Sequence, residues 1–409
     1  MTSILIVGAG PAGLACATTL TCQRVDADVE VVDPSGTWMA AWHRRFAAQD
    51  IPNLRSPAVH HPHPDPFGML EFAAGKGLIA SGGTQLPTTG LFDAFVDEMI
   101  ERRGLTDRVT PTGVTGLRIH TDGRAEVRLT DGSSRQPDRV VLATNARRSL
   151  VPDGLRDAAG TEVFADTERA NVANTPVGGH VVIVGGGLSA AHLAIGAARR
   201  GARVTMLARR RLRVRRFDTD PSWLGPRKRR PFEQEPDAFI RRRTIDTARG
   251  GGSVPARVRR DLDRCIEAGV IDLRERVEVV GCDAIGHRVR VRCTDDRAVL
   301  ADAMWCATGG RIDVGLDPLC QDLVTSFPTT IAHGLPDLAA DLSWPGTRVH
   351  LSGFGAALRL GPTAGNLVGQ RRAALRIAAA VRGDDPVRSD RIATGRGACP
   401  DDHDLVGAR

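Results

Sequence analysis

The stretch Ser3-Ile-Leu-Ile-Val-Gly-Ala-Gly-Pro-Ala-Gly13 decides the fold. An apolar run passes directly into three glycines spaced as Gly-x-Gly-x-x-Gly, and a helix of small residues follows to about Leu20. A second apolar strand, from about Asp28 to Val32, ends on Asp33. This order of strand, glycine turn, helix, strand and acid is typical of a dinucleotide-binding unit.

Each residue of this turn has a physical task. Gly8 permits the tight turn, Gly10 lets the backbone approach a pyrophosphate, and Gly13 lets the helix pack closely on the strand. The helix N-terminus offers amide donors to the anion, and Asp33 accepts hydrogen bonds from a ribose diol. We therefore expect a dinucleotide to bind at this turn.

The same device appears a second time, in His180-Val-Val-Ile-Val-Gly-Gly-Gly-Leu-Ser-Ala190. The strand that follows, around Arg203 to Leu207, leads to Arg209-Arg-Arg211 where the first unit has an acid. Arginine suits a ribose that carries a 2′-phosphate, whereas a plain 2′-hydroxyl would lack its acceptor there. The second unit therefore predicts NADPH rather than NADH. Ser189 either contacts a phosphate or caps the helix.

Two such units in 409 residues predict an α/β protein with two Rossmann-like three-layer domains, the second inserted into the first. Strand, helix and turn signals at Leu91–Ile100, at the hairpin turn Asp122-Gly123 and at the helix 255–268 fit this plan. The expected boundaries are 1–165 for the first part of the FAD domain, 166–305 for the NADPH domain with an Arg-rich excursion or lid at 217–253, 306–383 for the second part of the FAD domain, and 384–409 for a flexible tail.

Composition excludes several other classes of protein. The net charge is +7 and arginines cluster around 209–216 and 227–230, yet no aromatic residues interleave these runs as a nucleic-acid platform requires. No apolar stretch reaches the roughly 18 residues of a membrane helix, and the N-terminus reads as a buried strand rather than a leader. We expect a cytoplasmic protein that binds neither nucleic acid nor membrane. The eight cysteines form no C-x-x-C pair and no metal-ligand spacing.

A chain with two such units in this order resembles the two-dinucleotide-binding-domain flavoproteins, a group that includes flavin monooxygenases, lysine and ornithine N-hydroxylases and thioredoxin reductase-like enzymes. Val140-Val-Leu-Ala-Thr144 looks like the strand before the inserted domain, and Cys306-Ala-Thr-Gly309 looks like the group's Ala-Thr-Gly turn. Gly353 lies where the last flavin-contacting strand ends, although Phe354 replaces the usual acid. The resemblance implies FAD on the first unit and NADPH on the inserted one.

Within this group, the lack of a C-x-x-C pair argues against a dithiol relay. The segment Asp33-Pro-Ser-Gly-Thr-Trp38 is similar to the glycine and tryptophan loop of flavin monooxygenases. The monooxygenase linker signature would begin at Phe164, but its next diagnostic places hold Asp166, Ala170 and Asn174. The resemblance is therefore closest to the lysine and ornithine N-hydroxylase type.

This resemblance implies that NADPH reduces FAD, that oxygen forms a peroxyflavin, and that a small substrate, an amine or amino acid, is oxygenated at nitrogen. The alternative is an NADPH-dependent reductase that passes electrons to a quinone, a small acceptor or a redox partner; a non-enzymatic dinucleotide sensor is the third reading. The sequence marks no catalytic acid or base, names no substrate and leaves a homo-oligomer open.

The histidine run His60-His61-Pro62-His63 leaves a metal site, a flavin-proximal role and a plain loop as alternatives, and we predict no metal. Asp218, Asp220 and Trp223 are placed near substrate by chain order alone. The residues expected to contact a cofactor are Gly8, Gly10, Pro11, Ala12, Gly13, Asp33, Trp38, Trp42, Arg55, Val114, Ala143, Thr144, Gly185, Gly187, Leu188, Ser189, Arg209, Arg210, Thr308, Gly309 and Gly353.

Overall fold

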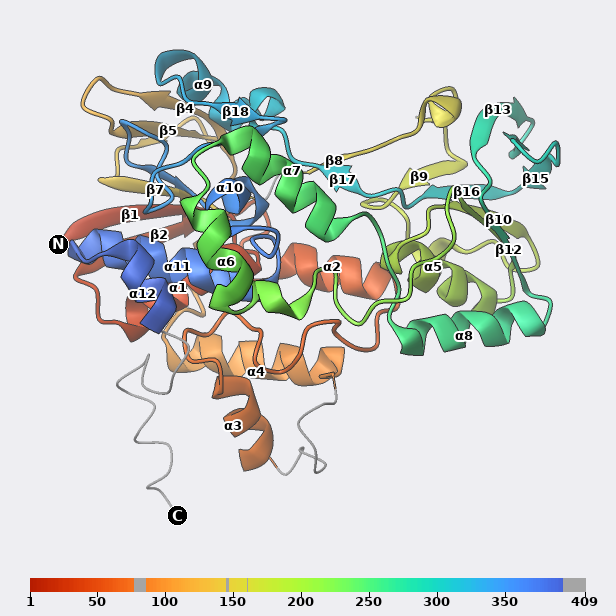
Figure 1. Ribbon diagram of the computed structural model, residues 1–409, viewed down its shortest axis with the longest axis horizontal. Coiled ribbons are helices and arrows are strands. Elements are labelled where there is room, and N and C mark those ends of the chain that lie inside the picture. The colour runs from red at the N-terminus through yellow and green to blue at the C-terminus, as the bar shows by residue number, and fades with distance from the viewer. Residues whose placement is uncertain (77–85, 145–146, 160, 393–409) are drawn as a thin grey trace.

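The computed structural model describes residues 1–76, 86–144, 147–159 and 161–392, and it has two lobes (Figure 1). The first lobe is built on a parallel five-stranded sheet whose strands are, in spatial order, β20 (Val349–Leu351), β7 (Arg139–Leu142), β1 (Thr2–Val7), β2 (Ala27–Val32) and β3 (Val109–Thr110). The central strand β1 is buried from Ile4 to Val7, which explains its unbroken apolar run.

The second lobe repeats this architecture. Its parallel sheet has the order β12 (Ile271–Glu275), β11 (Arg203–Ala208), β10 (His180–Val184), β16 (Ala303–Cys306) and β9 (Phe164–Asp166). The two small antiparallel sheets are β4 (Val114–Ile119), β5 (Ala125–Leu129) and β6 (Ser134–Arg135) in the first lobe, and β13 (Val279–Ile285), β14 (Arg288–Cys293) and β15 (Val299–Ala301) in the second. The predicted pair of Rossmann-like domains is confirmed.

Helices cover both sheets, and short strand pairs join or flank the lobes. The helices are α1 (Pro11–Cys22), α2 (Ala40–Ala48), α3 (Gly68–Gly75), α4 (Thr89–Arg102), α5 (Leu188–Arg199), α6 (Pro226–Gln234), α7 (Ala238–Arg249), α8 (Ala256–Glu267), α9 (Gln321–Ser326), α10 (Ala357–Leu360), α11 (Leu367–Arg382) and α12 (Pro386–Ile392). The antiparallel pairs are β8 (Arg148–Ser149) with β17 (Gly310–Arg311), and β18 (Ile331–Ala332) with β19 (Leu335–Pro336). The N-terminus of α4 is capped, because the Thr88 hydroxyl accepts from the Leu91 amide at 3.1 Å.

The second lobe begins earlier in the chain than the expected boundary at residue 165. Leu155, Ala158 and Phe164 are buried in one cluster with Val182 and Val184 of β10. The chain crosses between the lobes at β8, which pairs with β17 on the return crossing. Residues from about 153 therefore pack with the second domain, because their apolar side chains complete its core.

The Arg-rich excursion is helical and folds back onto the first lobe, as Figure 1 shows for α6 and α7. Phe232 and Ile245 are buried in the core of the first lobe, and Asp237 caps α7 by accepting from the Phe239 amide at 2.7 Å. The excursion starts in one domain and packs on the other, so it ties the two together.

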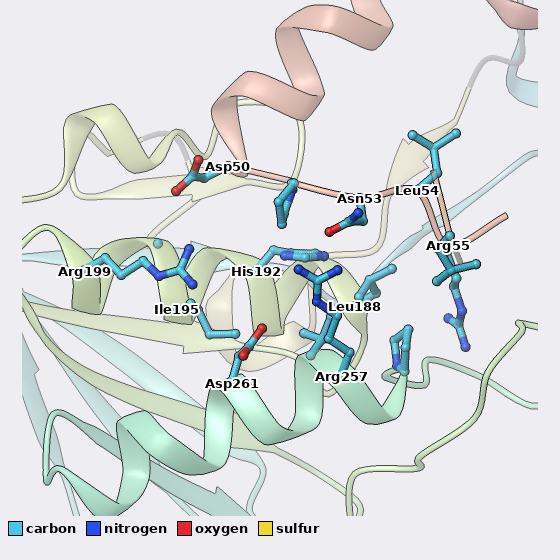
Figure 2. Close-up of a pocket in the computed structure, with 15 residues that line it drawn as sticks. Asp50, Asn53, Leu54, Arg55, Leu188, His192, Ile195, Arg199, Arg257 and Asp261 are labelled. Atoms are coloured by element: carbon cyan, nitrogen blue, oxygen red, sulfur yellow. The ribbon is translucent and has the colours of Figure 1, made fainter. Parts of the chain in front are cut away.

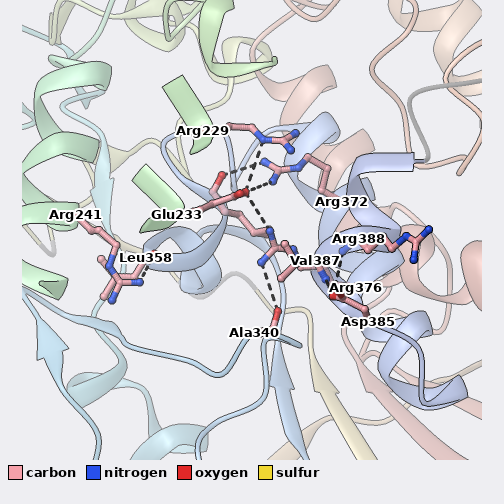
Figure 3. A network of polar contacts seen from close by, with 11 residues as sticks. Arg229, Glu233, Arg241, Ala340, Leu358, Arg372, Arg376, Asp385, Val387 and Arg388 are labelled. Atoms are coloured by element: carbon pink, nitrogen blue, oxygen red, sulfur yellow. Dashed lines mark hydrogen bonds and ion pairs between the residues drawn. The ribbon is translucent and has the colours of Figure 1, made fainter. Parts of the chain in front are cut away.

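A buried charge network fixes α6 in this place (Figure 3). Glu233 accepts hydrogen bonds from Arg372 at 3.3 Å and from Arg376 at 3.2 Å, both on α11. Arg229 lies 3.8 Å from the same carboxylate. Buried ion pairs contribute little net stability but are costly to break, so the network fixes the orientation of the helix.

The expected flexible tail begins with a helix. Pro386 opens α12, and the Asp385 carboxylate accepts from the amides of Val387 at 2.9 Å and Arg388 at 3.1 Å. A proline in the first turn and a capping carboxylate together favour a helix start. The rest of that expected tail, residues 393–409, lies outside the described residues. No helix among the described residues is long and apolar enough to cross a membrane.

Candidate functional site

The first glycine turn has the shape that a bound phosphate requires. Gly8 adopts φ +105°, and a Cβ atom there would lie 3.1 Å from the Ala143 carbonyl oxygen. A Cβ atom at Gly13 would collide with the Gly8 carbonyl oxygen, whereas at Gly10 it would meet no atom within 4 Å. The helix that follows starts with Pro11 at its N-terminus and no side-chain cap, so its amide donors face the open position beside Gly10.

Asp33 reaches across this turn. One carboxylate oxygen accepts from the Ala9 amide at 2.9 Å, and the other accepts from the Ser35 amide at 2.9 Å and from its hydroxyl at 2.6 Å. A carboxylate has about four lone-pair sites, so it retains capacity for a ribose diol. The fold therefore holds the Asp33 carboxylate beside the glycine turn, and its contact with a ribose remains a prediction.

The carboxyl edge of the first sheet gathers other predicted residues at the same turn. Ala143 donates its amide to Val7 at 2.9 Å, which places Ala143 and Thr144 beside Gly8. Gly353, with φ +69°, follows the Ser352 amide that donates to Leu142 at 3.0 Å. Val114 begins β4 next to Gly113, where a Cβ atom would lie 3.4 Å from Pro34, and Ala12 is buried in α1.

The two tryptophans of the loop after Asp33 pack in the first lobe. Trp38 is buried and donates its indole N–H to the Leu105 carbonyl at 2.8 Å. Trp42 stacks on Phe46 with ring centroids 4.1 Å apart. Among the described residues, the Trp42 indole nitrogen has no hydrogen-bond partner. The two rings have core contacts, and their expected contact with the cofactor remains a prediction.

The second glycine turn is equally tight. Gly185 adopts φ +150°, and a Cβ atom there would collide with the Ala307 carbonyl oxygen of the Ala-Thr-Gly turn. Gly187 precedes α5 in the N-cap position, and Ala190 is fully buried at the third position of the motif. Alanine suffices there because the helix still packs closely on the sheet.

A cleft of about 660 Å³ opens at this second turn. The predicted residues Gly185, Gly187, Leu188, Ser189, Arg209, Arg210, Thr308 and Gly309 all line it. Its described lining also holds the arginines Arg45, Arg55, Arg147, Arg211, Arg213 and Arg249 against the acids Glu168, Asp218 and Glu278. The strong positive excess matches a ligand with several phosphate charges. The arginines of this cleft therefore account for part of the net positive charge of the chain.

Arg55 joins the two domains, and its expected contact with a cofactor remains a prediction. Its guanidinium donates to the Asp218 carboxylate at 2.5 Å and to the carbonyls of Arg215 at 2.9 Å and Arg216 at 3.1 Å. It also donates to Ser253, at 2.8 Å to the hydroxyl and 3.1 Å to the carbonyl. The residue lines the cleft while holding the excursion in place.

Sequence reasoning missed Arg147 and Arg249. Burial and the nearby Arg249 and Arg45 lower the pKa of Arg147 below its usual value. Arg249 donates to the Pro362 carbonyl at 2.8 Å and lies over the Phe354 ring, 5.2 Å from its centroid. These arginines come from distant parts of the chain, so no local motif marks them.

The three residues that chain order alone places near the substrate lie in different surroundings. Asp218 lies in the cleft, but Asp220 accepts from the Ser222 amide at 2.8 Å, and Trp223 packs edge-on against Phe232 at 5.6 Å.

The histidine run is part of the first lobe's interior. His61 and His63 are buried, and the His61 ring lies 4.9 Å from the Phe95 ring. Among the described residues, no group of three or more histidines, cysteines, aspartates or glutamates is placed to hold a metal ion.

A smaller pocket lies between the domains, where residues 50–55 face α5 and α8 (Figure 2). Asp50, Asn53, His192 and Asp261 are among its lining residues, and Asp50 pairs with Arg200 at 3.5 Å. Burial lowers the pKa of His192 to about 4, so this imidazole is neutral at pH 7. No sequence signal marked this pocket.

Fold and site together define a protein with two dinucleotide-binding domains, each with a tight glycine turn at the start of a helix. The sequence profile of the pyridine nucleotide-disulphide oxidoreductase family matches residues 2–222, so the chain belongs to that family and is an oxidoreductase. The seven cysteines that the structure describes form no disulphide.

Solved structures with the same fold include two ornithine hydroxylases and a cadaverine monooxygenase. The ornithine N-hydroxylase of Kutzneria sp. 744, solved with reduced FAD, NADP⁺ and L-ornithine, matches with a TM-score of 0.78 at 18% identity, over 94% of this chain and 99% of that one. The ornithine hydroxylase of Pseudomonas aeruginosa matches with 0.74 at 16% identity, over 93% and 99%. The cadaverine monooxygenase of Erwinia amylovora matches with 0.74 at 14% identity, over 94% and 95%. No curated protein sequence matches the chain significantly.

Proposed function

We propose that the chain is an NADPH-dependent FAD monooxygenase that hydroxylates the nitrogen of a small amine or amino acid. The observation that carries the proposal is the presence of two tight glycine turns, each before a helix. Asp33 lies beside the first turn, and the second opens into the arginine-lined cleft. The fold shared with an ornithine N-hydroxylase, an ornithine hydroxylase and a cadaverine monooxygenase supports the same proposal.

In this proposal the first turn holds FAD through Gly8, Gly10, Gly13 and Asp33, and Gly353 lies at the same sheet edge. When bound, FAD accepts a hydride and then activates oxygen, which is chemistry that no side chain supplies. The chain's own residues position the cofactor by its phosphates and ribose. The buried edge around Ala143 keeps water from that part of the site.

The second turn orients NADPH. Ser189 and the α5 amides would receive the pyrophosphate, and Arg209 with Arg210 would receive the 2′-phosphate. Thr308 donates its hydroxyl to the Leu150 carbonyl and so fixes the wall of the cleft at the Ala-Thr-Gly turn. We assign no catalytic acid or base.

The direct test follows NADPH and product together. Purified protein loaded with FAD is given NADPH, oxygen and, separately, ornithine, lysine and cadaverine, while hydroxylated amine and hydrogen peroxide are both quantified. The proposal expects one of these amines to yield close to one hydroxylated product per NADPH consumed. Asp33→Ala, which removes the expected ribose acceptor, is the matched variant and should lose bound FAD and product together.

The opposite result would separate the alternatives. NADPH oxidation that yields only peroxide with every amine, together with rapid electron transfer to a quinone, would support a reductase instead. Absence of any NADPH oxidation by the FAD-loaded protein would contradict both.

A further inference from the structure

The loop Gly250–Ser253 lies directly on the second dinucleotide turn. A Cβ atom at Gly252 would lie 2.8 Å from the Gly187 Cα and 3.2 Å from its nitrogen. At Gly10, the equivalent glycine of the first turn, an added Cβ atom would meet no atom within 4 Å. Because the middle glycine is where the backbone approaches a pyrophosphate, the loop covers a face that the first turn leaves open.

Two arginines that line the cleft lie against this loop. Arg213 donates to the Gly250 carbonyl oxygen. The guanidinium of Arg210 lies beside Gly251, where a Cβ atom would collide with it. Arg210 follows β11, at the place where the 2′-phosphate is expected, so the loop and the phosphate would use the same side chains.

The first domain holds the other end of the loop. Arg55 donates to the Ser253 hydroxyl at 2.8 Å and to its carbonyl at 3.1 Å. At the base, the Val254 amide donates to the Arg213 carbonyl at 2.8 Å, and the Arg215 amide donates to the Val254 carbonyl at 3.0 Å. The base of the loop is therefore anchored at Val254, and the Arg55 contact ties Ser253 to the first domain.

The loop also has the backbone for movement. Gly250 adopts φ +58° and Gly251 adopts φ +87°, a region that other residues rarely enter. Gly251 and Gly252 are both exposed towards the cleft. Three successive glycines between a helix end and a fixed anchor allow the loop to change conformation at low steric cost.

We propose that Gly250–Ser253 is a latch over the pyrophosphate position of the nucleotide cleft, which withdraws when NADPH binds. The 2′-phosphate releases the latch by drawing Arg210 and Arg213 away from it. This rests on the proposed use of NADPH. An arginine hydrogen bond to a carbonyl is already charge-assisted, but a phosphate adds its own negative charge and can accept two parallel N–H bonds, so the exchange favours the open state. NADH has no such group, so the latch adds to the preference for NADPH.

The test uses the FAD-loaded protein and NADP⁺. Gly252→Ala places a methyl group against Gly187 and so disfavours the latched state. In rapid mixing, the wild-type binding rate should level off with NADP⁺ concentration at the opening rate. In the variant that limiting rate should rise about tenfold and the dissociation constant should fall. Hydrogen exchange of the 250–254 amides, measured without nucleotide, should also quicken.

Two further variants make the result decisive. Gly225→Ala, in the same excursion where a Cβ atom meets nothing within 4 Å, is the matched control and should bind like wild type. Ser253→Ala removes the hydroxyl that Arg55 binds without adding bulk, and it should also accelerate binding. Thermal unfolding of each variant checks that it is folded.

The outcomes are distinguishable. Unchanged or weaker NADP⁺ binding in folded Gly252→Ala or Ser253→Ala would overturn the latch and make the loop part of the binding wall. Absence of NADP⁺ binding in wild type and variants alike would overturn the latch and the NADPH assignment together. Accelerated binding with no amine hydroxylation would support the latch and count against the proposed function alone.

Discussion

At the scale of single residues, the two dinucleotide units differ most at the end of the second strand. The first unit has Asp33, which is hydrogen-bonded across the turn to the Ala9 amide at 2.9 Å. The second has Arg209 and Arg210, both exposed in the cleft. A carboxylate accepts hydrogen bonds from a ribose diol and repels a phosphate. An arginine pair donates hydrogen bonds to a phosphate and attracts its negative charge. We expect this one position to determine which domain binds FAD and which binds NADPH.

We expect Arg209→Gln combined with Arg210→Gln to raise the KM for NADPH by at least about tenfold, the loss of one charge-assisted hydrogen bond. The KM for NADH should not rise, because NADH has no 2′-phosphate for these side chains to bind and loss of the Arg210 contact with Gly251 only loosens the latch. Steady-state NADPH and NADH oxidation by the FAD-loaded protein measures both constants.

Arg290→Gln is the matched control, because Arg290 is an exposed arginine on β14 outside the cleft lining. It should leave both constants unchanged. Equal effects of the double substitution on the two nucleotides would sink the assignment of these arginines to the 2′-phosphate.

At the scale of elements, the joint between β1 and α1 depends on the last glycine of the motif. Gly13 faces the Gly8 carbonyl oxygen with no room for a side chain, and Ile6 of β1 lies 3.3 Å from the same position. A side chain here would push the helix away from the strand. The turn that receives the phosphate would open with it.

Gly13→Ala should therefore lower stability by about 1 to 3 kcal/mol, the usual cost of overpacking a tight core, and weaken FAD retention. Gly90→Ala is the opposite case: Gly90 lies in the first turn of α4, and a Cβ atom there meets nothing within 4 Å. That variant should be neutral or gain up to about 1 kcal/mol. Urea unfolding and the flavin absorbance of the purified variants measure both effects, and retained FAD with unchanged stability in Gly13→Ala would contradict the packing argument.

The elements that sequence predicted are those whose signal is local. Both glycine turns and their strands and helices follow from spacing within about thirty residues, and the Asp122-Gly123 turn joins β4 to β5 as expected. For the excursion, the sequence predicts a polar lid, because Pro231 and many arginines interrupt any apolar pattern in it. It is helical because Phe232 and Ile245 bury against the first domain, a contact that no local pattern reveals.

The candidate site likewise contains residues that a local motif predicts and residues that it does not. Gly185 and Arg209 belong to one motif and were predicted to act together. Arg147 and Arg249 meet them only because the inserted domain and its excursion fold back on the first domain. The small pocket at Asp50 and His192 likewise depends on how two domains face each other, which a single sequence does not encode locally.

At the scale of the whole molecule, polar contacts hold the domains together. Arg45 of α2 donates to the Glu168 carboxylate of the second domain at 2.5 and 2.6 Å, and Arg200, directly after α5, pairs with Asp50 at 3.5 Å. These pairs are partly exposed and contribute little stability by themselves. Arg55 adds hydrogen bonds to backbone carbonyls, which fix geometry more closely than a screened ion pair does.

Acid sensitivity is also a property of the whole molecule, because buried neutral histidines occur in both domains. Burial lowers the pKa of His192 to about 4 and lowers the pKa values of His61 and His350 below 6.5. Between about pH 6.5 and 4 the unfolded chain binds protons that the folded chain does not, so stability falls as the pH falls through this window. Each pKa unit corresponds to about 1.4 kcal/mol at a fully buried site.

We therefore expect the free energy of unfolding in urea to decrease from pH 7 to pH 5, before the acidic side chains begin to titrate. His192→Gln should flatten this dependence, because it removes one proton taken up only on unfolding. His120→Gln, at an exposed histidine of the first lobe, should leave the slope unchanged. Comparing slopes rather than absolute stabilities removes any packing cost of the substitutions. An identical slope in His192→Gln and wild type would mean that His192 takes up no extra proton on unfolding, so that its pKa is not lowered in the folded protein and the pocket between the domains is open to water rather than closed over a neutral ring.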